Sequence, residues 1–206
     1  MEQRKISERE DPRVLRTRQL LLQAFSDLYS EKGFHAMTVQ DVTSRARVNR
    51  GTFYSHFEDK YAILEDWLRE QFQQCVASPV LNSGPWSLST FRLLIERVVE
   101  WFTQLHQSTR SDERSLLPLV VTTVQEALFE LLWQGFKSVA GSGLDQQIDL
   151  ETVALVTSWA IFGTSFQCFH QWDEQTAVLS PEELASQVTR VLMRGLAQTL
   201  PALPLT

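Results

Sequence analysis

Residues 38–60, TVQDVTSRARVNRGTFYSHFEDK, carry the chemistry that this sequence displays most clearly. Phe53 and Phe57 lie four residues apart, as two rings do on one buried face of a helix. Hydrogen-bond donors occupy the other positions of that helix: Arg50, Thr52, Ser55 and His56. An exposed face made of donors indicates an acidic or polar partner.

Local signals in this stretch predict a helix-turn-helix. Thr38 is expected to cap the first short helix, with Asp41 three residues later as the acid of a capping box. Asn49 is expected to cap the second helix, after a turn near Arg47. In this arrangement the second helix enters the DNA major groove, while the first braces it across the backbone.

Further positions fit contact with a sugar-phosphate backbone. Gly51 has no side chain to hold the helix away from DNA. The Tyr54 hydroxyl is far enough from the backbone to reach a phosphate. Lys60 lies in the first turn of the next helix, which Asp59 can cap and where backbone N–H groups favour an anion. The stretch therefore predicts a DNA-binding surface.

The motif combination resembles the DNA-binding domain of the tetracycline-repressor (TetR/AcrR) family of bacterial transcription regulators. The resemblance runs from about Thr17 to Leu68. It is carried by Thr38-Val39, Ala46, Val48, Arg50-Gly51-Thr52-Phe53-Tyr54, His56-Phe57 and Lys60. It implies an all-α homodimer with an N-terminal three-helix DNA-binding domain and a larger helical C-terminal domain that binds a small inducer and dimerises.

The resemblance also implies which residues contact DNA. It implies phosphate contacts from Thr38, Thr52, Tyr54, His56 and Lys60, base or phosphate contacts from Arg50 and Gly51, and a contact from Ser55. The family usually has glycine where this chain has Arg47. A non-glycine residue in a left-handed turn costs about 1–2 kcal/mol. Arg47 is also a candidate phosphate contact.

The charges are unevenly distributed along the chain, whose formal net charge is −6. Residues 1–60 carry 11 Lys and Arg against 9 Asp and Glu, whereas residues 61–206 carry 8 against 16. The basic groups accompany the helix-turn-helix. We therefore expect DNA affinity to come from local contacts and dimerisation, with little help from a long-range field.

The composition favours an all-α protein. The chain has 206 residues, a hydrophobic fraction of 43%, 8 Gly and 7 Pro, and several segments of helical period. Cys75 and Cys168 lack metal-ligand spacing, and a buried structural thiol is a commoner fate than a redox sensor. The charged N-terminus lacks the apolar core of a signal peptide, so we expect a cytoplasmic protein.

The chain is expected to contain an arm, two domains and a linking helix. Residues 1–10 are predicted to be a disordered arm. Residues 11–60 are assigned to the DNA-binding domain, 61–77 to the linking helix, and 78–206 to the C-terminal domain, which starts with a loop over 78–89. The first helix is expected to have Asp11 as its N-cap and Pro12 as its first residue, and to end at Lys32-Gly33. Its apolar stripe comprises Val14, Leu21, Leu22, Phe25, Leu28 and Tyr29.

Four segments of the C-terminal domain have helical period: residues 89–107, 118–140, 150–172 and 180–198. Ser180-Pro181-Glu182-Glu183 is expected to open the last one as a capping box. Thr152 to Trp172 contains no charged residue, but eight of these 21 residues are Thr, Ser, Gln or His. That polar content argues against a membrane span.

The uncharged helix is instead expected to be buried on nearly every side. Its expected partner is the last helix, through the stripe Leu184, Val188, Val191, Leu192 and Leu196. Residues 150–172 and 180–198 of two subunits are expected to form a four-helix homodimer interface, where the resembled family also dimerises. Gly163 would permit a close approach there.

Aromatic residues are concentrated after the DNA-binding motif: all six Trp follow it, and seven of the twelve Phe lie between residues 91 and 169. This content suits a pocket for an aromatic or hydrophobic inducer, although such a stripe is usually core. The candidate lining residues are Trp101, Phe102, Phe129, Trp133, Thr157, Trp159, Phe162, Gln167 and His170.

The four His are scattered, and no metal, phosphate-loop or nucleophile motif is present, so we expect no active site, cofactor or metal. The sequence thus predicts a ligand-responsive repressor that binds a palindromic DNA operator as a homodimer and is released by a small molecule. Two alternatives stay open: a constitutive DNA-binding regulator without an inducer, and a helical enzyme or binding protein that retains a vestigial motif.

Overall fold

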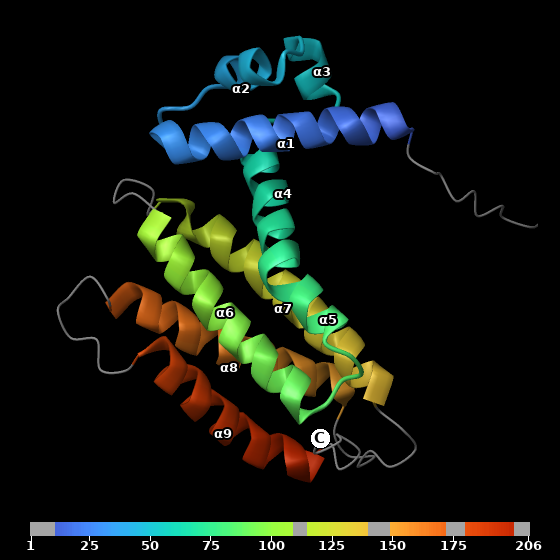
Figure 1. Cartoon of the computed structure of the whole chain (residues 1–206), viewed down its shortest axis with the longest axis vertical. Coiled ribbons are helices and arrows are strands. Elements are labelled where there is room, and N and C mark those ends of the chain that lie inside the picture. The colour runs from blue at the N-terminus through green and yellow to red at the C-terminus, as the bar shows by residue number, and fades with distance from the viewer. Residues whose placement is uncertain (1–10, 109–114, 140–148, 172–179, 200–206) are drawn as a thin grey trace, which may run out of the picture. The chain divides into compact units, whose positions relative to one another are not determined.

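The computed structural model describes residues 11–108, 115–139, 149–171 and 180–199. These described residues form helices joined by turns, with no strand among them, which confirms the predicted all-α class (Figure 1). The chain divides into two compact units, Met1–Trp67 and Leu68–Thr206. No helix in the described part of the chain is long and apolar enough to cross a membrane.

The first unit contains α1 (Pro12–Lys32), α2 (Val39–Ala46), α3 (Arg50–Tyr54) and the first turns of α4 (Lys60–Phe72). Figure 1 shows α2 and α3 lying along one side of α1. The predicted start of α1 is confirmed, because the Asp11 carboxylate accepts from the Arg13 N–H and Pro12 lies in the first turn. Gly33 ends the helix with a φ of 77°, a conformation that glycine adopts without strain.

The core of the first unit lies between α1, α3 and α4. Phe25, Phe34 and Phe53 are fully buried there. The Phe25 ring lies 5.9 Å from the Trp67 ring, so α1 is joined to α4 through aromatic side chains. Val14 is predicted to belong to the buried stripe but is 44% exposed, because the 21-residue α1 is far longer than the 8-residue α2 packed on it.

The second unit begins within α4, which continues through a π-helical turn, η1 (Gln73–Ala77), into α5 (Ser78–Asn82). In the π turn the Ser78 N–H donates to the Gln73 carbonyl, five residues earlier. The sequence predicts a loop from residue 78, whereas the chain stays helical to Asn82. Pro79 lies directly after the π turn, at the start of α5.

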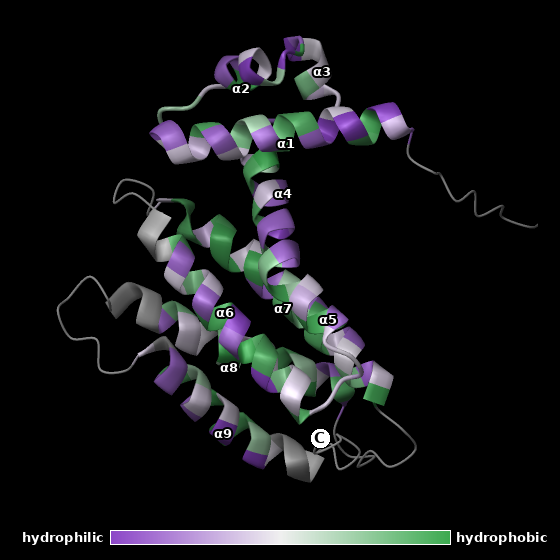
Figure 2. Ribbon diagram, in the orientation of Figure 1, coloured by the Kyte–Doolittle hydropathy of each residue, from purple (hydrophilic) through white to green (hydrophobic). Residues whose placement is uncertain are grey.

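Four long helices complete the described part of the second unit: α6 (Leu88–Ser108), α7 (Leu117–Val139), α8 (Leu150–Gln171) and α9 (Pro181–Thr199). They match the four predicted segments closely. Figure 2 shows hydrophobic and hydrophilic positions mixed along α6 and α9, as expected of amphipathic helices. The predicted capping box of α9 is present: the Ser180 N–H donates to Glu183 Oε2 at 2.8 Å, and the Glu183 N–H donates to Ser180 Oγ at 3.2 Å.

The packing of α8 differs from the prediction. Its main partners are α7 and α6, while α9 packs mainly on α6. One stripe of α8, which includes Ala154, Ser158 and Ile161, is buried against these neighbours. A second apolar stripe remains on the surface of the chain, because the partners of α8 lie on one side of it. Its large side chains are Leu155, Val156 and Trp159, which are 45%, 62% and 48% exposed.

Trp86, just before α6, packs directly on the backbone of α7. A Cβ atom at Gly135 would lie 2.0 Å from Cε2 of Trp86, a distance that no real pair of carbon atoms tolerates. The Trp86 ring also lies edge-on to the Phe136 ring, with centroids 5.9 Å apart. Glycine at position 135 therefore allows the segment before α6 to pack closely on α7.

Replacing Gly135 by alanine should lower the free energy of unfolding by about 1–3 kcal/mol, because the indole must shift out of a packed core. Thermal melting of the Gly135→Ala protein measures the change. Combining it with Trp86→Leu should cost less than the sum of the two single changes, because leucine leaves room for the methyl group. Strict additivity would show that the clash does not occur.

Candidate nucleic-acid interface

The first helix of the helix-turn-helix, α2, begins with the predicted capping box. Thr38 Oγ1 accepts from the Asp41 N–H at 3.2 Å, while the Thr38 N–H and hydroxyl donate to Asp41 Oδ2 at 2.8 and 2.7 Å. Lys32 Nζ lies 2.8 Å from the same oxygen. The bond from Lys32, followed by those from Thr38, holds the pKa of the Asp41 carboxyl well below its usual range. The end of α1 and the start of α2 are therefore tied together.

The turn after α2 depends on one left-handed residue. Arg47 has φ 57° and ψ 41°, and it is the only non-glycine residue with positive φ in the described part of the chain. Its N–H donates to the Ser44 carbonyl, and the Val48 N–H donates to the Thr43 carbonyl. The predicted left-handed position is thus confirmed, and it is occupied by an arginine.

The recognition helix, α3, is capped at its N-terminus and anchored by rings beneath it. Asn49 Oδ1 accepts from the Thr52 N–H at 2.7 Å and from the Thr52 hydroxyl at 3.1 Å. A Cβ at Gly51 would lie 3.2 Å from that oxygen, so glycine also leaves room for the cap. Phe53 and Phe57 are buried with ring centroids 5.7 Å apart, which confirms the predicted anchor.

Several predicted DNA-contacting hydroxyl groups already donate within the protein. The Thr38 hydroxyl donates to Asp41, that of Thr52 to Asn49, and that of Ser55 to the Thr52 carbonyl at 2.7 Å. A phosphate is an acceptor, so each would have to exchange this bond for a DNA contact. The structure thus gives these side chains a capping task beside the predicted one.

The Arg50 and Tyr54 side chains lie together on the exposed side of α3. The Arg50 guanidinium carbon lies 5.9 Å from the centroid of the Tyr54 ring, and Nη2 donates to the tyrosine oxygen at 3.3 Å. Tyr54 is 51% exposed, and its own hydroxyl hydrogen is left for a further acceptor. His56 is half-buried beside Phe57, with ring centroids 6.3 Å apart. Arg50 and Tyr54 therefore project donors from the recognition helix, whereas His56 lies in the turn after α3 ends at Tyr54.

Lys60 has a structural task at the start of α4. Its ammonium donates to the carbonyls of Phe34 and Met37 at 3.2 and 3.3 Å and lies 4.3 Å from the Phe34 ring centroid. The predicted cap of α4 is present, because Asp59 Oδ1 accepts from the backbone N–H groups of Tyr61 and Ala62. An ammonium has three hydrogens, so a phosphate contact of Lys60 would use the remaining one.

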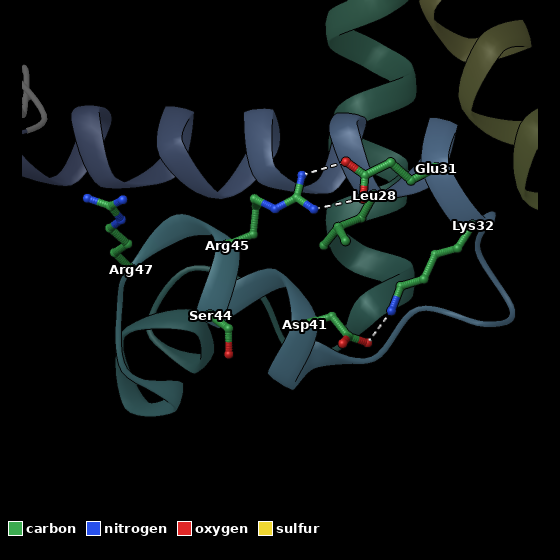
Figure 3. A pocket seen from close by; sticks show the side chains of 7 residues that line it. All are labelled: Leu28, Glu31, Lys32, Asp41, Ser44, Arg45 and Arg47. Atoms are coloured by element: carbon green, nitrogen blue, oxygen red, sulfur yellow. Dashed lines mark hydrogen bonds and ion pairs between the residues drawn. The ribbon is translucent and has the colours of Figure 1, made fainter.

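A hollow of about 570 Å³ lies between α1 and α2, and ion pairs form most of its wall (Figure 3). Arg45 donates to both carboxylate oxygens of Glu31 at 2.8 and 2.7 Å, which lowers the pKa of Glu31 and raises that of Arg45. Lys32 and Asp41 form the second pair. Figure 3 shows the Arg47 guanidinium apart from both pairs. Arg45 is therefore engaged within the protein, whereas the Arg47 guanidinium takes part in neither pair.

The predicted ligand-lining aromatics form a cluster in the second unit. Trp101, Phe102 and Phe162 are at most 5% exposed. The Phe102 ring lies edge-on to Phe162 at 5.3 Å and to Trp101 at 5.1 Å. Phe166, which the sequence did not single out, stacks on Phe162 at 5.5 Å. Its position one helical turn after Phe162 was the feature of the sequence that could have identified it as part of this cluster.

The other predicted ligand residues are dispersed. Trp159 is 48% exposed, although its ring lies 5.9 Å from Phe162. Phe129 is half-buried, and the Lys137 ammonium lies 4.8 Å from the centroid of the Trp133 ring. Thr157 is buried and Gln167 is exposed, whereas His170 lies outside the residues whose side chains are described.

Cys75 lies in η1 and is half-buried. Burial raises the pKa of its thiol, the nearby Glu100 carboxylate raises it further, and Arg97 acts in the opposite direction. A thiol held in the protonated form is a poor nucleophile. Cys168 lies outside the residues whose side chains are described.

Comparison with known proteins agrees with this geometry. Residues 21–66 match the model of bacterial regulatory proteins of the tetR family. The uncharacterized HTH-type transcriptional regulator YxbF of Bacillus subtilis is 33% identical over 76 residues, which are 36% of this chain and 20% of that protein. The HTH-type transcriptional repressor KstR2 of Mycolicibacterium smegmatis is 22% identical over 195 residues, or 87% of this chain and 90% of that protein.

Solved structures share the fold. The Thermus thermophilus transcriptional repressor FadR, in complex with lauroyl-CoA, superposes with a TM-score of 0.61 at 20% identity, covering 86% of this chain and 94% of that one. A TetR-family transcriptional regulator from Pectobacterium atrosepticum gives a TM-score of 0.58 at 18% identity, covering 93% and 98%. The fold and the site thus define a helix-turn-helix transcription regulator, and residues 21–66, its DNA-binding domain, match the tetR family of bacterial regulatory proteins.

Replacing Arg47 by glycine should have opposite effects on folding and on DNA binding. Glycine adopts the left-handed turn without strain, so the free energy of unfolding should rise by about 1 kcal/mol. If Arg47 binds a phosphate, its removal should make the slope of log affinity against log salt about 0.9 less negative. Thermal melting and binding at several salt concentrations measure the two effects. Unchanged affinity and salt slope would exclude the phosphate contact.

Proposed function

We propose that this regulator represses transcription by binding a palindromic operator as a homodimer in the cytoplasm, and that a small apolar molecule releases it. The observation that carries the proposal is a recognition helix capped by Asn49, anchored by Phe53 and Phe57, and carrying Arg50 and Tyr54 on its exposed side. Arg50 suits base edges, because a guanidinium binds guanine through two hydrogen bonds. Two such helices would contact half-sites centred about 34–36 Å apart, or a multiple of that.

Exposed apolar side chains on α8 and α9 support the homodimer. Leu155, Val156 and Trp159 share one face of α8, and Val191 of α9 is 71% exposed. A Cβ at Gly163 would meet no atom of its own chain within 4 Å, so a partner helix could approach closely there. Burying such a face removes apolar area from water, which favours association. A two-fold arrangement of α8 and α9 would cover it.

A charge on this face should separate the subunits. Val156→Glu places a carboxylate on the exposed stripe, so the monomer should fold but associate less. Analytical ultracentrifugation measures the oligomeric state. The matched control is Leu81→Glu on α5, since Leu81 is also exposed, at 52%, but lies outside the proposed interface. A monomeric wild-type protein, or an unaffected Val156→Glu dimer, would contradict the proposal.

The aromatic cluster of the second unit supports an apolar ligand. Phe102, Phe162 and Phe166 form a cluster of aromatic rings whose apolar surface suits an acyl chain or a flat ring. Two structural neighbours, the FadR proteins of Thermus thermophilus and Bacillus subtilis, were crystallised with lauroyl-CoA and stearoyl-CoA. We therefore propose an acyl thioester as the first ligand class to test.

Release from DNA tests this ligand class. Lauroyl-CoA added to a complex of the protein with its operator should lower the fraction of bound DNA, as measured by fluorescence anisotropy. Coenzyme A without the acyl chain is the control and should have little effect, because the aromatic cluster would bind the chain. If neither lauroyl-CoA nor other apolar compounds change the affinity, the protein is a constitutive regulator without an inducer.

A further inference from the structure

Arg18, in the N-terminal part of α1, contacts two other parts of the first unit at once. Its guanidinium forms an ion pair with the carboxylate of Asp66 on α4. The central carbon of the same guanidinium lies 5.2 Å from the centroid of the Phe57 ring. Phe57 is the second of the two rings that anchor the recognition helix. Arg18 therefore joins that anchor to α4.

Arginine suits both contacts better than lysine does. Its planar guanidinium stacks on an aromatic face while its edge binds a carboxylate. The side chains of Arg18 and Asp66 are 40% and 24% exposed, so the pair is partly withdrawn from water and from screening by salt. Arg13 and Arg16, on the same helix, are exposed. Arg18 is therefore less exposed than these two arginines and contacts other parts of the first unit.

The recognition helix needs such a contact because it is short. It spans five residues, too few for its own backbone hydrogen bonds to keep it folded or oriented. Among the other elements of the first unit, it packs mainly on α2. Its orientation toward α4 therefore depends on side chains, and Arg18 supplies one through Phe57.

We propose that Arg18 is a positioning residue for DNA recognition: it holds Phe57, and through it the recognition helix, in a fixed orientation to α4 without itself contacting DNA. The proposal rests on the proposed operator binding. When the Arg18–Asp66 pair is broken, the recognition helix gains orientations that fit the groove less well, and affinity falls. A direct phosphate contact from Arg18 would behave differently, because it would not need Asp66.

The test compares variants of the full-length protein on an operator duplex selected by the wild type, whose binding first establishes the proposed function. Arg18→Met and Asp66→Asn should each weaken binding by about tenfold, the size of one partly buried interaction. The slope of log affinity against log salt should stay as in the wild type, since the same phosphates remain bound. Arg18→Lys should restore part of the affinity, because it keeps the charge pair but not the stacked plane.

Circular dichroism at the binding temperature should show every variant fully folded, so that weaker binding reports orientation and not unfolding. Arg92→Met, which breaks an exposed Arg92–Glu96 pair on α6, is the matched control and should bind like the wild type. A salt slope about 0.9 less negative in Arg18→Met, with wild-type affinity in Asp66→Asn, would overturn the proposal in favour of a phosphate contact. Unchanged affinity in both variants would also overturn it.

Discussion

A five-residue helix cannot orient itself, and the DNA-binding unit depends on the side chains that hold α3 at its two ends. Asn49 accepts from the backbone N–H and the hydroxyl of Thr52 at one end, and the buried rings of Phe53 and Phe57 fix the other. The left-handed turn at Arg47 sets the direction in which α3 leaves α2. These contacts leave Arg50 and Tyr54 on the exposed side of α3, the side that we propose binds DNA.

Much of the DNA-binding unit could be predicted because its signals are local. The caps at Thr38 and Asn49, like the cap at Ser180 in the second unit, depend on side chains that bind backbone groups within three residues, and sequence spacing describes such contacts fully. The left-handed turn at Arg47 was indicated by the resemblance, because the resembled family usually has glycine at this position. Long-range contacts carry no such signal. The bonds of Lys60 to the Phe34 and Met37 carbonyls and the Arg18–Asp66 pair join residues 23 to 48 positions apart.

The second unit shows the same division between local and long-range information. The periods of α6 to α9 were visible in the sequence because each helix has an apolar stripe that repeats every three to four residues. The sequence did not show which helices these stripes pack against. In the structure α9 packs more on α6 than on α8. An uncharged helix such as α8 has two apolar faces, and composition does not say which one a single chain buries. The exposed face of α8 fits association between subunits. The face of α8 that carries Phe162 packs on Phe102 of α6 in the core.

The central claim is that α3 reads DNA from a two-fold dimer, and selection of bound sequences from random duplex DNA tests it most directly. The purified protein at moderate salt should enrich an inverted repeat whose half-sites lie about one or two helical turns apart. The same selection with Arg50→Ala should relax the preference at one base pair in each half-site, at symmetric positions. Enrichment of no repeat, or an identical preference in the variant, would contradict this account.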